Sequence, residues 1–141
     1  MDFEKTKKHL WELRASKKVL IAAHSGTKSG LTDPEYFHGF AEITRRYPNL
    51  YGDTSAFNVP LRGRHIRKCL MEPLASRLVH GSDFPVPVNG LWAWLRGFLS
   101  WKAYRQAQRT SNVLERDYRL KVAMGFKSDH FTRIAQLLRF S

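Results

Sequence analysis

The most regular feature of the chain is a set of short apolar runs that each end in polar residues. Three such runs can be drawn: Val19–Ala23 ending at His24, Leu50–Gly52 ending at Asp53, and Arg77–His80 leading through a Gly-Ser pair to Asp83. Short apolar runs with polar boundaries are typical of strands buried on both faces, as in parallel sheets. The pattern therefore predicts three strands, with polar residues at their carboxyl ends.

Helical spacing of apolar residues fills much of the remaining chain. Asp33 is the expected N-cap of a helix that begins at Pro34 and stops before Pro48, and Ser128 is the expected N-cap of the last helix. The predicted helices are 2–15, 34–47, one through Ile66, Cys69 and Leu70, then 91–108, 114–124 and 128–139.

The three polar strand ends are evenly spaced. His24 and Asp53 are 29 residues apart, and Asp53 and Asp83 are 30 residues apart. About 30 residues is the length of one βαβ unit. The sequence therefore predicts an α/β fold with three parallel strands, flanking helices and a helical C-terminal tail, in one structural unit over residues 1–141.

Composition narrows the class of protein. The hydrophobic fraction of 43% is enough for a packed core, and the net charge of +12 would attract anionic partners. The basic residues are scattered, however, and no nucleic-acid-binding signature accompanies them, so solvated helix faces are favoured over a nucleic-acid groove. The single cysteine, Cys69, is expected to pack as a small apolar residue. No signal peptide or membrane span is predicted, and a cytoplasmic protein with no membrane partner is expected.

Four polar residues at strand ends are candidates for chemistry, because ligands of parallel α/β folds bind beyond the carboxyl ends of the strands. They are His24, Asp53, Ser55 and Asp83. Asp53 and Ser55 are expected to satisfy loop amides. His80 is three residues before Asp83, so the two should point to opposite faces of a regular strand. His65 lies in a basic cluster, Arg62–Lys68, that could hold an acidic group but is more often a solvated first helical turn.

The segments around His24 and Asp83 occur in larger patterns. Val19-Leu-Ile-Ala-Ala-His-Ser-Gly26 and Leu78-Val-His-Gly-Ser-Asp-Phe-Pro85 resemble the strand six and strand eight signatures of the amidohydrolase superfamily, in its amidohydrolase-related branch. Between them, Tyr47–Ala56 resembles strand seven, and Arg116–Gly125 resembles the C-terminal helical tail. The likeness covers nearly the whole chain in the right order, and Gly-Ser-Asp-Phe-Pro is its most specific block.

This resemblance implies a metal-dependent hydrolase, or sometimes a decarboxylase, built on a (β/α)₈ barrel. One or two divalent metals, with zinc expected, would activate water for attack on a carbonyl-type carbon of a small-molecule substrate. Asp83 matches the strand eight aspartate that contacts the metal or its water and moves the proton. His24 matches the strand six histidine that binds a second metal or orients water. His24 and Asp83 are thus the candidate catalytic residues and metal ligands.

The sequence also departs from that family. The six histidines include no His-x-His pair, which strand one of the family supplies, and the counterparts of strands one to five are not found before His24. A complete barrel typically takes about 250 residues, and a catalytic zinc site usually has three protein ligands. We therefore expect the C-terminal part of such a barrel, inactive by itself, as a fragment or one half of a split enzyme.

Three further expectations follow. A partial barrel would have two open sheet edges, one where strand five belongs and one where strand one belongs, and these favour self-association or pairing with a complementing N-terminal half. A different class of function is a non-catalytic basic module that binds nucleic acid or another anionic partner. A redesigned site that holds one metal through His24, Asp53 and Asp83 is a third possibility.

Overall fold

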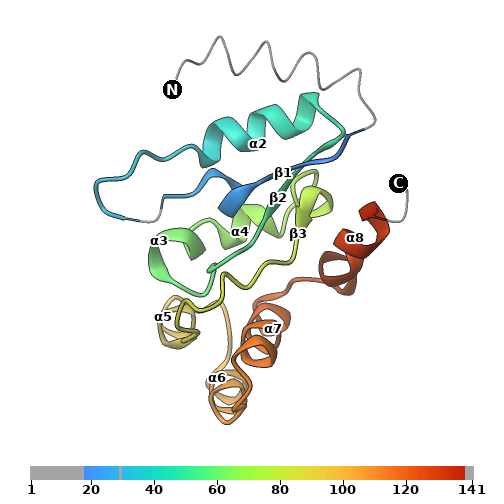
Figure 1. Cartoon of the computed structure of the whole chain (residues 1–141). Coiled ribbons are helices and arrows are strands. Elements are labelled where there is room, and N and C mark those ends of the chain that lie inside the picture. The colour runs from blue at the N-terminus through green and yellow to red at the C-terminus, as the bar shows by residue number, and fades with distance from the viewer. Residues whose placement is uncertain (1–17, 29, 139–141) are drawn as a thin grey trace.

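A computed structural model describes residues 18–28 and 30–138, and these form a mixed α/β unit around one open sheet of three strands (Figure 1). The strands are β1 (Leu20–Ala22), β2 (Leu50–Asp53) and β3 (Leu78–Val79), in the order β1-β2-β3. Both neighbouring pairs are parallel: Leu20 is opposite Leu50, and Gly52 is opposite Leu78. The predicted parallel α/β arrangement is confirmed for three strands, and a closed barrel is not found among the described residues.

Each strand differs at its ends from the predicted run. β1 stops at Ala22 because a 3₁₀ turn, η1 (Ala23–Gly26), takes the chain out of the sheet. β3 begins only at Leu78, because Arg77 belongs to a second 3₁₀ turn, η2 (Ala75–Arg77). β2 extends one residue further than predicted, through Asp53. The polar residues still follow the carboxyl ends of the strands.

The prediction of a helix start at Asp33 and Pro34 is wrong, because α2 spans Phe37–Arg46. The Asp33 carboxylate accepts from the backbone N–H of Gly30, 2.6 Å away, and so closes the preceding loop instead of capping a helix. The N–H of Tyr36 donates to the carbonyl of Gly26 (2.9 Å), which ties residues 34–36 to the turn after β1. A long-range backbone bond thus delays the helix by one turn.

The helices after β2 and β3 are more broken than their apolar spacing predicted. The segment after β2 forms two single turns, α3 (Pro60–Gly63) and α4 (Ile66–Cys69). The predicted helix 91–108 is two helices, α5 (Leu91–Leu95) and α6 (Trp101–Gln108). Gly97 has a left-handed φ of 71° at the break, and the Ser100 hydroxyl accepts from Ala103 N as the N-cap of α6.

The last two helices agree closely with the sequence pattern. α7 spans Val113–Met124, with Asn112 as its N-cap and Gly125 in a left-handed conformation at its end. α8 spans Ser128–Leu138, so Ser128 is its first residue and not its N-cap. The predicted helix over residues 2–15 lies outside the described residues, as does Arg139, the predicted end of the last helix.

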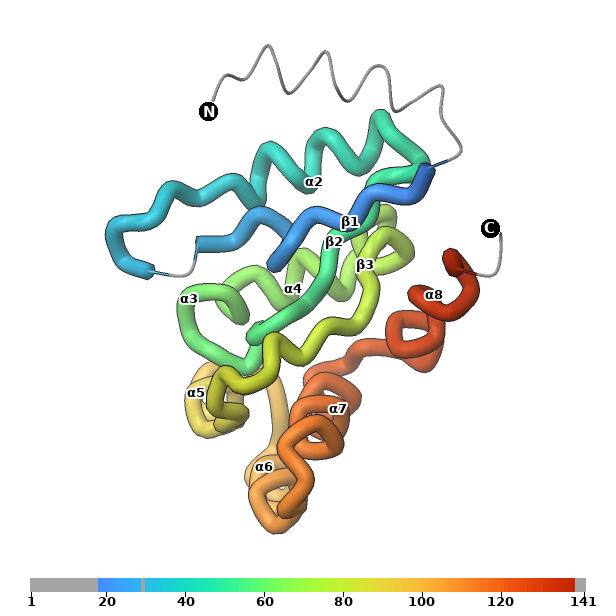
Figure 2. Tube along the Cα trace, in the orientation of Figure 1, coloured from blue at the N-terminus to red at the C-terminus, as the bar shows by residue number. Residues whose placement is uncertain are grey.

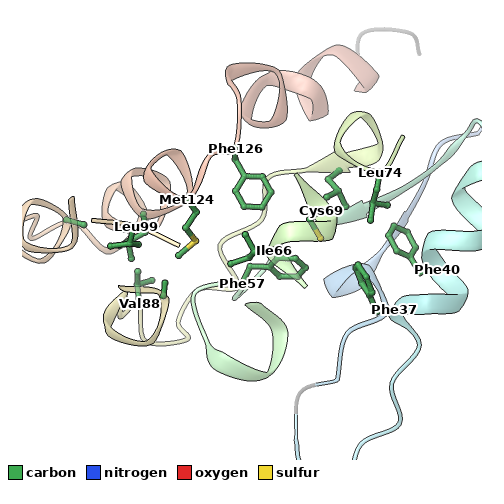
Figure 3. Close-up of a cluster of buried hydrophobic side chains, with 14 of the residues drawn as sticks. Phe37, Phe40, Phe57, Ile66, Cys69, Leu74, Val88, Leu99, Met124 and Phe126 are labelled. Atoms are coloured by element: carbon green, nitrogen blue, oxygen red, sulfur yellow. The ribbon is translucent and has the colours of Figure 1, made fainter. Parts of the chain in front are cut away.

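One continuous core joins the sheet to the C-terminal helices. Figure 3 shows its side chains running from Phe37 and Phe40 of α2, through Ile66 and Cys69 of α4, to Met124 of α7. Gly52 is required in β2, because a Cβ there would collide with the Phe40 ring and the Ser25 hydroxyl. Cys69 is fully buried, as predicted, and burial raises the pKa of its thiol.

The prediction of two open sheet edges is wrong at β3, because α8 covers that edge (Figure 2). The backbone N–H of His80 donates to the carbonyl of His130 (3.1 Å). The carbonyl of Leu78 accepts from the Arg133 guanidinium and from the His130 ring. α8 therefore docks on the sheet edge at which strand one of a complete barrel would pair. None of the described helices has the length and apolar character needed to cross a membrane.

Candidate functional site

The parallel strands bring His24 and Asp83 together at one rim of the sheet. The His24 Nδ1 lies 4.0 Å from the Asp83 Oδ2, and both side chains are 28% exposed. Both residues have left-handed backbones, with φ of 53° at His24 and 61° at Asp83. Left-handed non-glycine residues cost about 1–3 kcal/mol each and cluster at functional sites. The two residues that the sequence singled out are therefore neighbours, and both are held in strained conformations.

Asp53 has the structural role that was predicted for it. Its Oδ1 accepts from the backbone N–H groups of His24 (3.1 Å) and Ser55 (2.9 Å). The Asp53 carbonyl accepts from the buried hydroxyl of Ser25 (2.7 Å). These bonds fix the turn after β1 against the end of β2, and they hold the unfavourable backbone of His24 in place. Ser55 likewise contributes its backbone to the rim.

The residue that sequence reasoning missed is Arg62, which lies between the two candidates. It is only 7% exposed, and its Nη1 lies 2.5 Å from Asp83 Oδ2 and 2.9 Å from His24 Nδ1. A guanidinium can only donate, so His24 Nδ1 is the acceptor in this hydrogen bond. The sequence placed Arg62 in a solvated basic cluster. Arg62 is the third residue of α3, and no local signal in the sequence distinguished it from Arg64.

This arrangement does not fit a divalent metal. Zinc bonded to both His24 Nδ1 and Asp83 Oδ2 needs bonds of about 2.0–2.2 Å, so a 4.0 Å separation would require an angle of roughly 140–180° at the metal, well above the tetrahedral value. The cationic Arg62 lies between the same two atoms. Within residues 18–28 and 30–138, no group of three His, Cys, Asp or Glu side chains could hold a metal ion. The three-residue site of His24, Asp53 and Asp83 is thus not supported, since Asp53 is engaged with backbone amides.

A second group of buried charges lies directly behind the rim, on α7. Asp117 and Lys121 are both fully buried, and Lys121 Nζ lies 2.7 Å from Asp117 Oδ2 and 2.5 Å from the Gly81 carbonyl. Burial raises the pKa of Asp117 and lowers the pKa of Lys121, while their mutual attraction opposes both shifts. The spacing of four residues on one helix was a signal for this pair.

His80 belongs to this buried group and not to the rim. Its Nε2 lies 3.8 Å from Asp117 Oδ2, and burial lowers its pKa to about 4. The side chain therefore diverges from Asp83, as the sequence predicted. Asn58 completes the group, because its Nδ2 lies 3.3 Å from Asp117 Oδ1. This network ties α7 to the segments that follow β2 and β3, and so stabilises the loops that carry the rim.

The His65 cluster divides into a buried part and an exposed part. His65 is 9% exposed and stacks on Phe37, with ring centroids 4.0 Å apart. Burial and the charge of Arg64 lower the pKa of His65 to about 4. Glu35 contacts both residues, through an ion pair with Arg64 and at 3.3 Å from His65 Nε2. His65 is thus a neutral packing residue, whereas Arg64, Arg67 and Lys68 are exposed as predicted.

A pocket of about 790 Å³ lies away from the rim, between α2 and the segment that follows α4. Its lining carries both signs of charge, with Glu42 and Glu72 beside Arg45, Arg46 and Lys68. It contains neither candidate residue, so it does not extend the His24–Asp83 site. Comparisons with protein-family models, with curated proteins and with solved structures found no match to this chain.

Proposed function

We propose that this chain is the C-terminal part of an amidohydrolase-type metal-dependent hydrolase. His24 and Asp83 would derive from the rim of its active site. The described residues alone would not catalyse hydrolysis. One observation carries the proposal. His24 follows β1 and Asp83 follows β3, the two parallel strands on either side of β2, and their side chains meet at the carboxyl ends of the sheet. Sequence order and strand order agree with strands six, seven and eight of that fold.

The strained backbones of the two residues add support. Left-handed backbones also occur at Ser25 and Ala56, and glycine would adopt this conformation with less strain than any of the four residues. Strained backbones cluster at active sites, so their presence at both candidate residues is compatible with a functional rim. In the enzyme that we propose, Asp83 would hold or move a proton of the attacking water, and His24 would orient water or substrate.

Two features of the described residues argue that this activity is switched off in the present arrangement. Arg62 ties up both His24 Nδ1 and Asp83 Oδ2, so neither atom can accept a proton or bind a metal without displacing it. α8 covers the edge of β3 at which strand one of the complete barrel would pair. A complementing N-terminal half that carries the missing ligands, including a His-x-His pair, would have to displace α8 from this edge and draw Arg62 aside.

Zinc binding to an Arg62→Ala variant tests whether His24 and Asp83 are a metal-binding rim. Removing the guanidinium frees both atoms, and small movements of the rim can then bring them within reach of one ion. We expect calorimetric titration to show one weakly bound zinc in Arg62→Ala and none in the wild-type chain. The double variants Arg62→Ala/Asp83→Ala and Arg62→Ala/His24→Ala should lose that zinc.

Arg64→Ala is the matched control, because Arg64 is the same residue type two positions away and contacts Glu35 instead of the rim. It should bind no zinc. Zinc binding by Arg62→Ala that survives in both double variants would contradict the proposed rim, and so would the absence of any binding. Stoichiometric zinc in the wild-type chain that is lost in Asp83→Ala would contradict the proposal that the chain is inactive by itself. Hydrolysis of an activated ester by the wild-type chain would contradict it directly.

The second candidate function is a non-catalytic module that binds an anionic partner. It is favoured by one observation: among the described residues, the exposed side chains of Arg67 and Arg96 have no acidic side chain within ion-pair distance. Binding to DNA or RNA that weakens steeply with salt, in a chain that retains no zinc, would support this function over the hydrolase.

A further inference from the structure

A second concave site lies where α4 faces α5 and the turn that follows it. The pocket has a volume of about 330 Å³ and is lined by Arg64, Arg67, Leu95, Arg96 and Phe98. A volume near 300 Å³ is at the lower end of the range of pockets that bind small ligands. Three of the five lining residues are arginines, and none of the five belongs to the His24–Asp83 rim.

The charge of this pocket is only partly compensated. Glu35 pairs with Arg64, whereas among the described residues no acidic side chain pairs with Arg67 or Arg96. Guanidinium groups that line one pocket repel each other, and a bound anion would remove that repulsion.

The apolar residues of the pocket give it a second kind of contact. The Arg67 guanidinium lies over the Phe98 ring, 5.6 Å from its centroid, and this contact holds the arginine against the pocket wall. Phe98 is itself held by Trp92, with ring centroids 5.4 Å apart. Leu95 is 67% exposed, so part of the apolar wall is open to a ligand. The site therefore combines one arginine that is held against the wall, Arg67, with a second exposed arginine, Arg96, and an apolar surface.

We propose that this pocket binds a small organic phosphate, up to the size of a mononucleotide. A phosphate monoester carries about −1.5 to −2 charges at neutral pH, which matches two uncompensated guanidinium groups, whereas a single carboxylate carries one. Arginine also donates two parallel hydrogen bonds to phosphate oxygens. The organic part of the ligand packs against Leu95 and the exposed part of Phe98.

This proposal does not depend on the hydrolase proposed above. It names a binding site and a class of ligand for the second candidate function, the module that binds an anionic partner. An Asp83→Ala variant removes the rim carboxylate and leaves the arginine pocket untouched, so it should bind the phosphate like the wild-type chain. Failure of the zinc experiment and failure of the phosphate experiment can therefore be told apart.

Calorimetric titration with adenosine monophosphate tests the pocket. We expect one saturable site, with weaker binding of inorganic phosphate and of adenosine, because each supplies only one of the two kinds of contact. Arg67→Gln and Arg96→Gln should each weaken binding about tenfold, the loss expected for a charge-assisted hydrogen bond. Arg67→Lys should restore part of the affinity, since it keeps the charge without the planar fork.

Arg109→Gln is the matched control, because Arg109 is an exposed arginine at the end of α6 and does not line the pocket. It should bind adenosine monophosphate like the wild-type chain. The proposal is overturned if no saturable binding occurs, or if Arg109→Gln loses as much affinity as Arg67→Gln. Preferential binding of a single-stranded oligonucleotide, weakened equally by all three glutamine variants, would also overturn it and would indicate general attraction to polyanions.

Discussion

The backbone N–H of His80, just after β3, donates to the carbonyl of His130 in α8 across 3.1 Å. His80 and Leu78 are the residues whose backbone groups face the outer edge of β3, and α8 satisfies both. Covering an exposed edge with a helix is one of the ways in which proteins prevent edge-to-edge association. β1 is the other edge strand, and no strand of the described residues pairs with its outer edge.

Self-association, if it occurs as the sequence predicts, should therefore use β1. Ile21 is the middle residue of β1 and is 42% exposed. We expect Ile21→Lys to shift the chain toward monomer in sedimentation velocity, because a charged side chain on an edge strand disfavours pairing with a second sheet. Leu31→Lys is the control, since Leu31 is more exposed (82%) but lies in a loop. Equal effects of the two variants would point to general hydrophobic association, and a monomeric wild-type chain would contradict association altogether.

The stability of the fold should fall in mildly acidic solution because of His130. This side chain is buried between Leu78 O and Thr54 Oγ1, and burial lowers its pKa from 6.5 to about 3. Between these two pKa values the unfolded chain binds a proton that the folded chain does not, so stability is full above about pH 6.5 and falls as the pH decreases toward 3. This one histidine should lower the free energy of unfolding by about 2 kcal/mol at pH 5 relative to pH 7.

Urea unfolding of the wild-type chain and of His130→Gln at both pH values measures this contribution. The variant should be less stable at pH 7, because it loses a fitted side chain, but its stability should change less between pH 7 and pH 5. Titrating groups that do not contact His130, such as Asp117, are common to both proteins, so their contributions cancel in the comparison. An identical loss of stability in the two proteins would show that His130 does not carry the pH dependence.

The buried Asp117–Lys121 pair should be strongly coupled. Lys121→Met leaves the Asp117 carboxylate buried without its cation, and breaking a buried pair on one side costs about 3–5 kcal/mol. The double variant Asp117→Asn/Lys121→Met removes both charges and should recover a large part of that loss. The exposed pair of Glu115 and Arg119 on the same helix, also four residues apart, is the control. Arg119→Met should cost no more than about 0.5 kcal/mol in thermal or urea unfolding.

The parts of the fold that could be predicted from the sequence depend on local patterns. The strand runs are short and apolar, and their polar ends recur at even spacing, so the parallel order and the meeting of His24 with Asp83 followed from the periodicity. The start of α2 could not be predicted in this way, because it depends on a backbone bond between Tyr36 and Gly26. The same holds for the docking of α8, which involves hydrogen bonds to backbone groups at the edge of β3 that no pattern within the helix indicates.

The candidate site also combines residues that local patterns indicate with a residue that only long-range packing identifies. His24 and Asp83 stand out because each follows a strand, whereas Arg62 is one of seven residues in a basic segment and nothing local distinguishes it from Arg64. Only the packed structure shows that Arg62 is buried between the two candidates while Arg64 is exposed. His24 and Asp83 therefore suggest a metal site in the sequence, and Arg62 opposes one in the folded chain.

His24 gives the sharpest test of whether the rim stores strain. A left-handed backbone costs an L-residue about 1–2 kcal/mol relative to glycine, so His24→Gly should be more stable than His24→Ala by about 1 kcal/mol. Both variants lose the contact of the imidazole with Arg62, so that loss cancels in the comparison. Urea unfolding of the two variants measures the difference directly. If His24→Ala were as stable as His24→Gly, the backbone at position 24 would not be strained, and the support that this strain lends to a functional rim would be lost.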